Sequence, residues 1–341
     1  MQGKAFRQAR LRLRLTQGEL RDALNGRLGR SYDKHRLSRW ENDHEPIPAE
    51  VAAALEALAA ETPRHARVLA VANQKGGVGK TTTALNLAYA LSRGGRRVLL
   101  LDLDPQATAS VALLASGSVG AYREGRTMAH VILRDRPLRE ALIHAGEPAG
   151  DRPAPFDLVA SHIDLAESDG RREPGFEVAL REALEPVRGD YDHIVLDAPP
   201  NLGTLTVMAL AAADEALIPV RTEPYDTMGV GLILATITKV QRRLNPGLRL
   251  AGVLPTQFGP RKAVDKEVLA QLVIALDGKA AVLEPVPDSA VFGHAARNGR
   301  IALEASPGSA APAVYARLAA ALAAGEPLPR APDNIRAPQE A

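Results

Sequence analysis

The sequence predicts an α/β protein with a doubly wound, mostly parallel sheet, preceded by a small all-helical domain. Three observations support this prediction. From residue 68 onwards, continuous apolar runs alternate with helical patterns, as in sheets whose strands are buried on both faces. A glycine-rich segment joins the first apolar run to the first helical pattern. Before residue 62, the chain shows only short helical patterns.

The predicted strands are six apolar runs of five to seven residues each. Runs of this length without polar alternation suit strands that helices cover on both faces. They lie at residues 68–72, 98–104, 156–160, 193–197, 215–220 and 248–254.

Helices and loops are predicted between the strands. In residues 80–95, apolar side chains recur at helical spacing, and two glycines at the end supply a stop. The stretch 115–155, rich in Gly, Arg and Pro, is predicted to be a long connection with one helix at about 127–143. Residues 325–341 contain four prolines and no apolar stripe, so we expect a disordered tail there.

Composition excludes several classes of protein. The chain has 341 residues, enough for about two domains, and its 46% apolar and 24% charged residues are typical of globular proteins. The absence of cysteine excludes disulfide scaffolds, thiolate metal sites and iron–sulfur clusters. No apolar run approaches the roughly 18 residues that cross a bilayer, and the N-terminus lacks the apolar core of a secretory signal. We therefore expect a cytoplasmic location and no membrane partner.

Charge is unevenly distributed along the chain. Residues 1–40 contain 11 Lys or Arg and 3 Asp or Glu, whereas the rest of the chain contains 31 and 37. A basic terminal segment on an otherwise acidic chain favours a nucleic-acid partner. The alternative is a solvated basic surface without a partner.

The strongest motif is NQKGGVGKTTT at residues 73–83, between a predicted strand and a predicted helix. Its glycines allow the backbone to approach phosphate oxygens, and the start of the helix adds a positive dipole end. Lys80 would reach the β- and γ-phosphates, and the Thr81 hydroxyl would bind Mg²⁺. The standard phosphate-loop pattern has glycine where this chain has Gln74, and an additional lysine, Lys75, follows. A flexible glycine turn would explain the glycines but not the two lysines and the threonine run.

Aspartates end two of the predicted strands. Asp102 and Asp104 follow one apolar run, and Asp197 ends another. Carboxylates at strand ends beside a phosphate loop supply ligands for metal and water, which phosphoryl transfer needs for charge neutralisation and positioning. Alone, each aspartate could equally be a helix cap or a turn former.

The K-G-G-x-G-K-T segment resembles the deviant phosphate loop of the ParA/MinD ATPases. The resemblance covers roughly residues 67–323 and continues in three further segments, DLDPQATAS, FDLVASHIDLAESD and YDHIVLDAPPNLGTLT. Within that family, D-P-Q-A-T and D-A-P-P-N-L-G are typical of the ParA partition branch. The resemblance therefore implies a P-loop ATPase that uses ATP and Mg²⁺.

The resemblance also implies roles for individual residues. Lys75 would cross a dimer interface to the partner's nucleotide, and Asp104 would orient the attacking water. Asp102 would lie near the magnesium ion, and Asp197 would hold it. The implied catalytic residues are Lys75, Lys80 and Asp104; the implied magnesium ligands are Thr81, Asp102 and Asp197; the implied nucleotide contacts are Lys75, Gly76, Gly77, Val78, Gly79, Lys80, Thr81 and Thr82.

One segment departs from the family pattern. Near the position of Pro287, ParA proteins often have the pattern P-R-N-x-R. In that pattern the asparagine helps to bind adenine and the arginine can help to bind DNA. Here Asp288 and Ser289 follow that proline. We therefore expect adenine contacts from Thr256 and Pro287. DNA contacts are expected from Arg261, Lys262, Arg297 and Arg300, for which plain surface charge is the alternative.

The N-terminal segment predicts three helices. Thr16 and Glu19 form a capping box that opens one helix, and Leu37 and Trp40 give a second its apolar side. An Ala/Leu-rich helix is predicted at 46–61.

This segment resembles a Cro/repressor-type helix-turn-helix, with about six extra residues between its two halves. Asp33 would cap the recognition helix, and Leu37 and Trp40 would lie in the core. The alternative is a helical protein-interaction module. The expected DNA contacts are Gln17, Lys34, His35, Arg36 and Arg39.

These predictions combine into four segments: a helix-turn-helix domain at 1–62, a linker at 63–66, an ATPase domain at 67–324 and the tail at 325–341. The resemblance implies a cytoplasmic, nucleoid-associated DNA-partition ATPase, in which an ATP-sandwich homodimer binds DNA without sequence preference. A ParB-like centromere-binding partner would stimulate slow hydrolysis, and the N-terminal domain would bind an operator and autorepress.

Two alternatives remain open. In the first, the chain is a transcription regulator for which ATP is only a ligand. In the second, it is a MinD-like membrane-positioning ATPase. The second alternative would need a basic amphipathic C-terminal helix, whereas residues 313–324 contain one basic residue.

Overall fold

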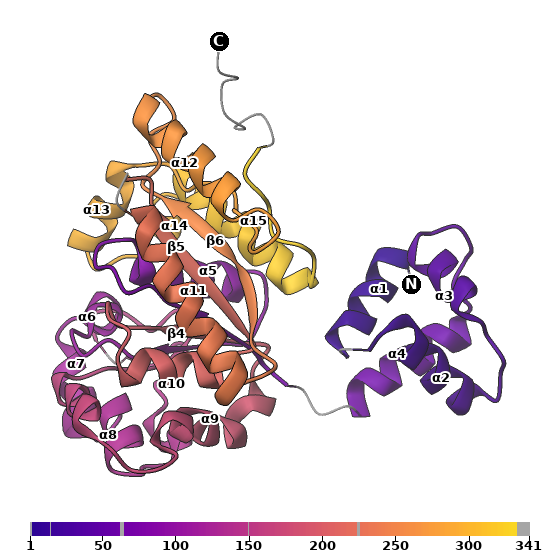
Figure 1. The fold of residues 1–341 in the computed structure, drawn as a ribbon. Coiled ribbons are helices and arrows are strands. Elements are labelled where there is room, and N and C mark those ends of the chain that lie inside the picture. The colour runs from indigo at the N-terminus through magenta and orange to yellow at the C-terminus, as the bar shows by residue number, and fades with distance from the viewer. Residues whose placement is uncertain (1, 14, 62–64, 149, 224–225, 333–341) are drawn as a thin grey trace. The chain divides into compact units, whose positions relative to one another are not determined.

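The computed structural model describes residues 2–13, 15–61, 65–148, 150–223 and 226–332. Their contacts divide the chain into two compact units, one formed mainly by residues 2–61 and one mainly by residues 65–320 (Figure 1). Each unit has its own apolar core. None of the helices within the described ranges is long and apolar enough to span a bilayer.

The larger unit is built on a six-stranded sheet in which every neighbouring pair is parallel. The strand order is β3-β2-β4-β1-β5-β6, so β2 and β3 lie on one side of β1, β4 returns to the position between β2 and β1, and β5 and β6 lie on the other side. All six predicted strands and the doubly wound α/β fold are confirmed. The strands are β1 (Arg67–Val71), β2 (Val98–Asp102), β3 (Asp157–Val159), β4 (His193–Asp197), β5 (Glu215–Arg221) and β6 (Arg249–Thr256).

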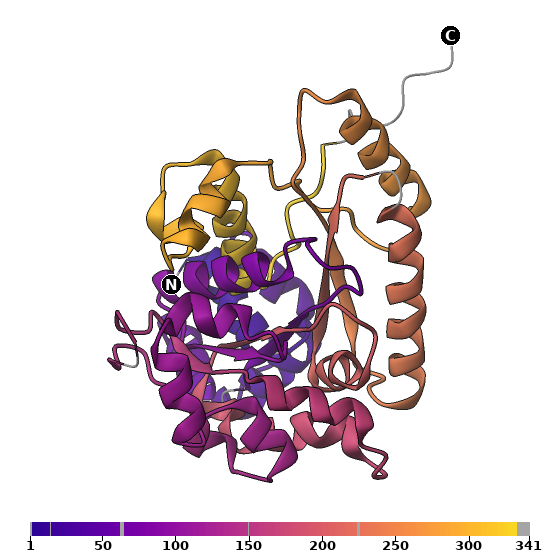
Figure 2. The same ribbon diagram turned by 90° about the vertical axis from the view of Figure 1, so that its left-hand side faces the viewer.

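Helices pack against both faces of this sheet (Figures 1 and 2). Val68 and Ala70 of β1 belong to one apolar cluster with residues of α10 and α11, and their neighbours in β1 point to the opposite face, where α5 packs. The helices after residue 65 are α5 (Lys80–Arg93), α6 (Thr108–Leu114), α7 (Gly117–Arg123), α8 (Met128–Leu133), α9 (Ala179–Leu184), α10 (Thr204–Ala212), α11 (Asp226–Arg243), α12 (Ala263–Ala275), α13 (Ala290–Arg297), α14 (Ala302–Ala305) and α15 (Ala310–Ala324), with short 3₁₀ helices η1 (Leu138–Ala141), η2 (Ile163–Gly170), η3 (Phe176–Val178) and η4 (Glu185–Asp190).

The single helix predicted at about 127–143 is wrong. The chain instead forms α8, which ends at Leu133, and then the separate 3₁₀ helix η1. Asp135 between them has a left-handed backbone with φ of 51°, and Pro137 cannot donate a helical hydrogen bond. The same connection also contains α7, which the composition of this stretch did not predict.

The predicted tail at 325–341 begins where α15 ends, but part of it is ordered. Arg330 pairs with Leu283 in an antiparallel bridge, and Ala331 donates a 3.0 Å backbone hydrogen bond to the Val282 carbonyl. Backbone pairing of this kind needs no apolar stripe, which is why the composition did not reveal it. Residues 333–341 lie outside the described residues.

The smaller unit packs four helices around one apolar core. The predicted capping box is present, because the Glu19 amide donates to the Thr16 hydroxyl at 3.2 Å and the Thr16 amide donates to the Glu19 carboxylate at 2.7 Å. Trp40 and Leu37 are fully buried, as predicted, and Trp40 meets the ring of Phe6 edge-on. The helices are α1 (Gly3–Arg12), α2 (Gln17–Leu28), α3 (Lys34–Glu41) and α4 (Ala49–Glu61).

Buried His193, at the start of β4, makes stability depend on pH. Burial and the nearby Arg67 and Arg96 lower the pKa of His193 from 6.5 to about 4. Below pH 6.5 His193 is protonated in the unfolded chain but stays neutral in the folded chain. The stability that is present above pH 6.5 is therefore lost as the pH falls towards 4. We expect His193→Gln to remove this loss, which amounts to about 3 kcal/mol between the two pKa values. Urea unfolding of the wild type and the His193→Gln variant at pH 7 and pH 4.5 measures the free energy of unfolding. If the two proteins differ in this free energy by the same amount at both pH values, the expectation is contradicted.

Candidate nucleotide site

The segment between β1 and α5 has the backbone of a phosphate-binding loop. Gly77 and Gly79 have φ values of 72° and 83°, a left-handed conformation that glycine adopts without strain. Gly79 is the N-cap of α5, and no side chain caps that helix. The first amides of α5 therefore point their hydrogens into the loop, where an anion can accept them.

Two side-chain amides, the buried Asn73 and the exposed Gln257, hold this loop in place. Asn73 donates to the Pro219 carbonyl at 2.7 Å and accepts from the Lys75 amide at 3.1 Å. Gln257 donates to the Gly77 carbonyl at 2.8 Å. The loop is thus preorganised by Pro219 of β5 and by Gln257, which directly follows β6, neither of which the sequence motif singled out.

Thr256, a predicted adenine contact, lies beneath the loop. Its hydroxyl donates to the Val78 carbonyl at 2.9 Å, and its side chain is nearly fully buried. This hydrogen bond ties the end of β6 to the loop. Pro287 pairs with Phe258, just after β6, so both predicted adenine contacts lie near the end of that strand. Their contact with adenine stays a prediction.

Lys80 is the buried cation of the site. Its ammonium group donates to the Lys75 carbonyl across the loop at 2.8 Å. Burial lowers the pKa of Lys80, and the nearby carboxylates of Asp197 and Asp104 raise it. The structure therefore brings together the loop, its lysine and two of the three predicted aspartates.

Asp102 and Asp197 are register partners on the adjacent strands β2 and β4, and both are fully buried. Asp102 accepts hydrogen bonds from the Ser110 hydroxyl at 2.7 Å, the Ser110 amide at 2.9 Å and the Asp104 amide at 3.1 Å. Burial raises the pKa of Asp102 to about 6, although these hydrogen bonds lower it. Asp102 is therefore held by α6, and Ser110 is a contact that sequence reasoning missed.

Asp197 has no such support. The Thr81 hydroxyl is close enough to favour its ionised form, yet neither carboxylate oxygen has a partner with full hydrogen-bond geometry in the described part of the chain. Burial and the neighbouring Asp102 raise the pKa of Asp197 well above its ordinary value. An unpartnered buried carboxylate is costly, and a divalent cation would neutralise it.

The side chains present fit magnesium only in combination with a ligand. Across the described residues, no group of three or more His, Asp or Glu side chains could hold a metal ion alone. Mg²⁺ commonly binds one or two protein oxygens together with substrate phosphates and water. Asp197 and Thr81 beside the loop suit that arrangement, whereas the oxygens of Asp102 are already occupied by hydrogen bonds.

Asp104 and Lys75 differ in how far they are exposed. Asp104 accepts a 3.0 Å hydrogen bond from the Gln106 amide, which fixes one of its oxygens, and it is mostly buried. Lys75 is half exposed, and its ammonium lies 3.8 Å from the carboxylate of Glu223. Glu223 also pairs with Arg221 of β5. The Lys75 side chain is therefore accessible from outside the unit.

The predicted DNA contacts are divided between the two units. In the larger unit, Arg261, Lys262, Arg297 and Arg300 are exposed, with Lys262 3.8 Å from Asp288 and Arg300 3.7 Å from Glu304. These residues lie at two places in the chain: Arg261 and Lys262 directly precede α12, and Arg297 and Arg300 lie at and just after the end of α13.

In the smaller unit, the predicted contacts differ in how they are engaged. Lys34 and His35 are exposed at the start of α3. Arg36 and Arg39 both pair with Glu45, at 3.0 and 3.3 Å, and Gln17 donates to Glu41 at 2.8 Å. Of these five side chains, only Lys34 and His35 are exposed without a bond to Glu41 or Glu45.

Comparison with known proteins identifies the larger unit. A protein-family model described as an AAA domain matches residues 66–250, which is more than half of the chain. The chromosome-partitioning ATPase Soj of Thermus thermophilus is 41% identical over 253 residues, covering 74% of this chain and 94% of Soj. The chain belongs to the ParA/Soj family of P-loop ATPases. The chromosome partitioning protein ParA of Myxococcus xanthus is 40% identical over 210 residues, covering 60% of this chain and 70% of that protein.

Solved structures agree with this ParA-family assignment. Cobyrinic acid a,c-diamide synthase from Mycobacterium smegmatis, determined with bound ADP and magnesium, has 35% identity and a TM-score of 0.63 over 78% of this chain and 98% of that one. The ATP complex of McdA from Cyanothece has 20% identity and a TM-score of 0.64 over 77% of this chain and 97% of McdA, which supports the fold alone. A nucleotide with magnesium occupies the first of these two structures.

Proposed function

We propose that this ParA-family chain is a DNA-partition ATPase that binds Mg-ATP at the loop between β1 and α5. The observation that carries the proposal is the unpartnered, buried Asp197 beside Thr81 and the preorganised loop. A cation neutralises a buried carboxylate of this kind. Phosphate oxygens accept hydrogen bonds from the loop amides and from the Lys80 ammonium group. The two requirements meet in one ligand, a nucleoside triphosphate with magnesium.

The residues of the site divide the work of phosphoryl transfer. The loop amides and Lys80 would bind the phosphates and neutralise charge that develops on the leaving group. Magnesium held by Thr81 and Asp197 would neutralise further charge on the β- and γ-phosphates. Asp104, fixed by the Gln106 amide, would orient the attacking water and accept its proton.

Two chains would form the active assembly. Lys75 is a second lysine of the loop, and its side chain is half exposed beside Glu223, whereas Lys80 is buried. We propose that it reaches the nucleotide of a second copy, so that two chains enclose two ATP molecules. The ATP-bound dimer would bind nucleoid DNA through exposed arginines and lysines without sequence preference, and a ParB-like partner would stimulate slow hydrolysis.

The smaller unit would add sequence-specific DNA binding. Its basic charge, the capped α3 and the exposed Lys34 and His35 at the start of that helix support this role. The simplest operator is that of the chain's own partition genes. A MinD-like membrane role is disfavoured, because the one basic residue of α15, Arg317, pairs with Glu284 at 2.6 Å. If the protein sediments together with liposomes in the presence of ATP, the MinD-like membrane role would be favoured instead.

The test of sequence-specific binding uses the double variant Lys34→Ala, His35→Ala in the full chain. A preferred duplex is first selected from a random pool with the wild-type chain. Removing a side chain that reads a base should cost about 1–3 kcal/mol, so affinity for the selected duplex should fall roughly 5-fold to 150-fold or more. Fluorescence anisotropy at fixed salt measures it, and binding to an arbitrary duplex with ATP should change little.

A matched control is Arg242→Ala, an exposed arginine of α11 in the larger unit. It should leave affinity for the selected duplex unchanged. Undiminished affinity in the double variant would contradict DNA recognition by α3 and favour a protein-interaction module. A chain that binds the duplex and ATP but shows no hydrolysis with DNA and partner present would instead be a transcription regulator.

A further inference from the structure

A cavity lies at the edge of the sheet opposite the phosphate loop. It has a volume of about 400 Å³ and opens where β2 and β3 begin, at Val98 and Asp157, whereas the loop follows the end of β1. In a parallel sheet all strands begin at one edge, so the two sites are separated by the length of a strand, about 16 Å for five residues. A cavity of this volume lies within the usual range for small-molecule sites.

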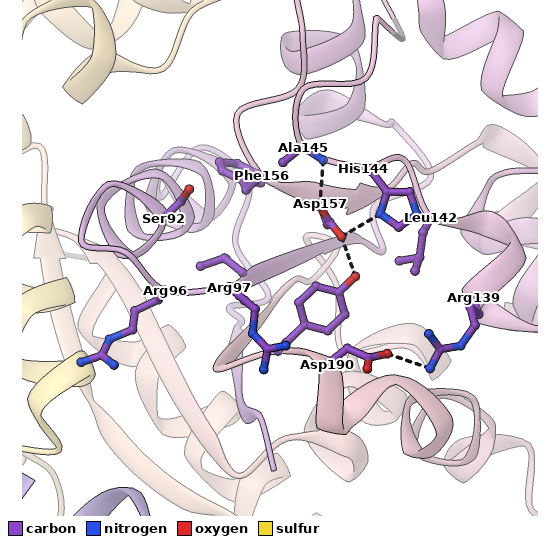
Figure 3. Close-up of a pocket in the computed structure, with 12 residues that line it drawn as sticks. Ser92, Arg96, Arg97, Arg139, Leu142, His144, Ala145, Phe156, Asp157 and Asp190 are labelled. Atoms are coloured by element: carbon purple, nitrogen blue, oxygen red, sulfur yellow. Dashed lines mark hydrogen bonds and ion pairs between the residues drawn. The ribbon is translucent and has the colours of Figure 1, made fainter. Parts of the chain in front are cut away.

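Asp157 forms a fixed polar wall of this cavity. Its carboxylate accepts hydrogen bonds from the Tyr191 hydroxyl at 2.7 Å, from the Ala145 amide at 2.8 Å and from the His144 ring at 3.0 Å. Figure 3 shows the contacts of the Asp157 carboxylate with Ala145 and His144 as dashed lines. Burial and Asp157 raise the pKa of Tyr191, so its hydroxyl stays a donor to Asp157. The negative charge of Asp157 is therefore satisfied within the protein.

The remaining charge of the cavity is positive. Three arginines line it, Arg96, Arg97 and Arg139, against the carboxylates of Asp157 and Asp190. Arg139 is directed at Asp190, with the two charged groups 2.7 Å apart (Figure 3). Among the residues that the structure describes, the Arg97 guanidinium makes only long contacts, 3.9 Å to Asp192 and 3.5 Å to the Gly189 carbonyl, and its side chain is half exposed. An arginine in this position can form a two-pronged contact with a carboxylate or phosphate.

The rest of the lining is apolar apart from Ser92, whose hydroxyl donates to the Pro155 carbonyl at 3.2 Å. Its apolar residues are Val98, Leu142 and Phe156, and each is almost fully buried. A hydrated inorganic ion gains nothing from such walls, whereas an organic body does.

We propose that this cavity is a binding site for a small organic anion that carries one carboxylate or phosphate group on an apolar body. Arg97 holds the anionic group, and the apolar walls accept the body. The proposal does not depend on the function of the phosphate loop, because no lining residue of the cavity belongs to that loop.

The test measures binding of benzoate and phenyl phosphate to the full chain by calorimetry, with inorganic phosphate for comparison. Saturating Mg-ADP keeps the phosphate loop from contributing. We expect at least one aromatic anion to bind, and inorganic phosphate to bind roughly 10-fold more weakly or not at all. The better of the two probes identifies the anionic group that the site prefers.

Variants locate the binding. Arg97→Gln should weaken the aromatic anion roughly 10-fold or more, and Ala145→Phe, which fills the cavity from an exposed position, should abolish its binding. The matched control Arg181→Gln changes an exposed arginine of α9 outside the cavity and should have no effect. Failure of both probes to bind the wild-type chain would overturn the proposal. Binding that neither variant changes, or inorganic phosphate that binds as tightly, would overturn it as well.

Discussion

Lys80→Ala should reduce the affinity for Mg-ATP roughly 100-fold or more, because it removes the buried cation that we propose to contact the phosphates. The Lys80 ammonium lies 2.8 Å from the Lys75 carbonyl, inside a loop that Asn73 and Gln257 hold in place. The loop backbone should therefore keep its shape in the variant, and the loss should reflect the missing charge. Isothermal calorimetry with Mg-ATP measures it.

The matched control is Lys75→Ala, in the same loop. Its side chain is half exposed beside Glu223, so a single chain should bind Mg-ATP within a few-fold of the wild type. If the lysine reaches a second copy, light scattering should show that ATP no longer produces dimers. Unchanged Mg-ATP affinity in Lys80→Ala would contradict the assigned site, whereas a loss of affinity in both variants would place the two lysines at one nucleotide.

The fold was predictable because its strongest signals are local. Each strand is a continuous apolar run, and buried parallel strands need nothing else to be recognised. The wrong helix at 127–143 shows the limit of this reasoning. Apolar residues continue at helical spacing on either side of Asp135, but its left-handed backbone and Pro137 divide them into α8 and η1. The backbone of Asp135 and the proline at 137 together decided that element, and apolar periodicity reports neither of them.

The site was predictable where one short segment carries its chemistry. The motif places Gly77, Gly79, Lys80 and Thr81 on adjacent positions, and the strand ends bring Asp102 beside Asp197. The supporting contacts were not predictable, because they join segments distant in sequence. Asn73 reaches a carbonyl 146 positions away, and Gln257 reaches one 180 positions away. Side-chain amides at such positions look like ordinary surface residues until the sheet is assembled.

The pairing of charges was also invisible in the sequence. Arg36 and Arg39 look like DNA contacts in a helix with a basic start, yet both pair with Glu45 in the structure. Such partly exposed pairs contribute little to stability, roughly 0–1 kcal/mol, so phosphate groups can replace Glu45 as their partner. The same reasoning applies to Lys262 and Asp288 in the larger unit.

Asp104→Asn should leave Mg-ATP affinity within a few-fold of the wild type but reduce hydrolysis roughly 100-fold or more. The amide has the size of the carboxylate and can still accept the 3.0 Å hydrogen bond from Gln106, so the geometry is kept. What it loses is the negative charge and the ability to take a proton from water. Single-turnover hydrolysis with the protein in saturating excess over ATP, with DNA and the proposed ParB-like partner present, measures the chemical step separately from binding.

Two comparisons make this result specific to Asp104. Asp277→Asn changes an exposed carboxylate that follows α12, and it should hydrolyse ATP at the wild-type rate. Asp197→Asn should instead weaken the magnesium dependence of ATP binding, because it replaces the unpartnered buried carboxylate. Loss of ATP binding in Asp104→Asn would make this residue a metal or structural group. Wild-type hydrolysis in Asp104→Asn would assign the water-orienting role to another residue, and the buried Asp102 on the same strand end is then the group to replace.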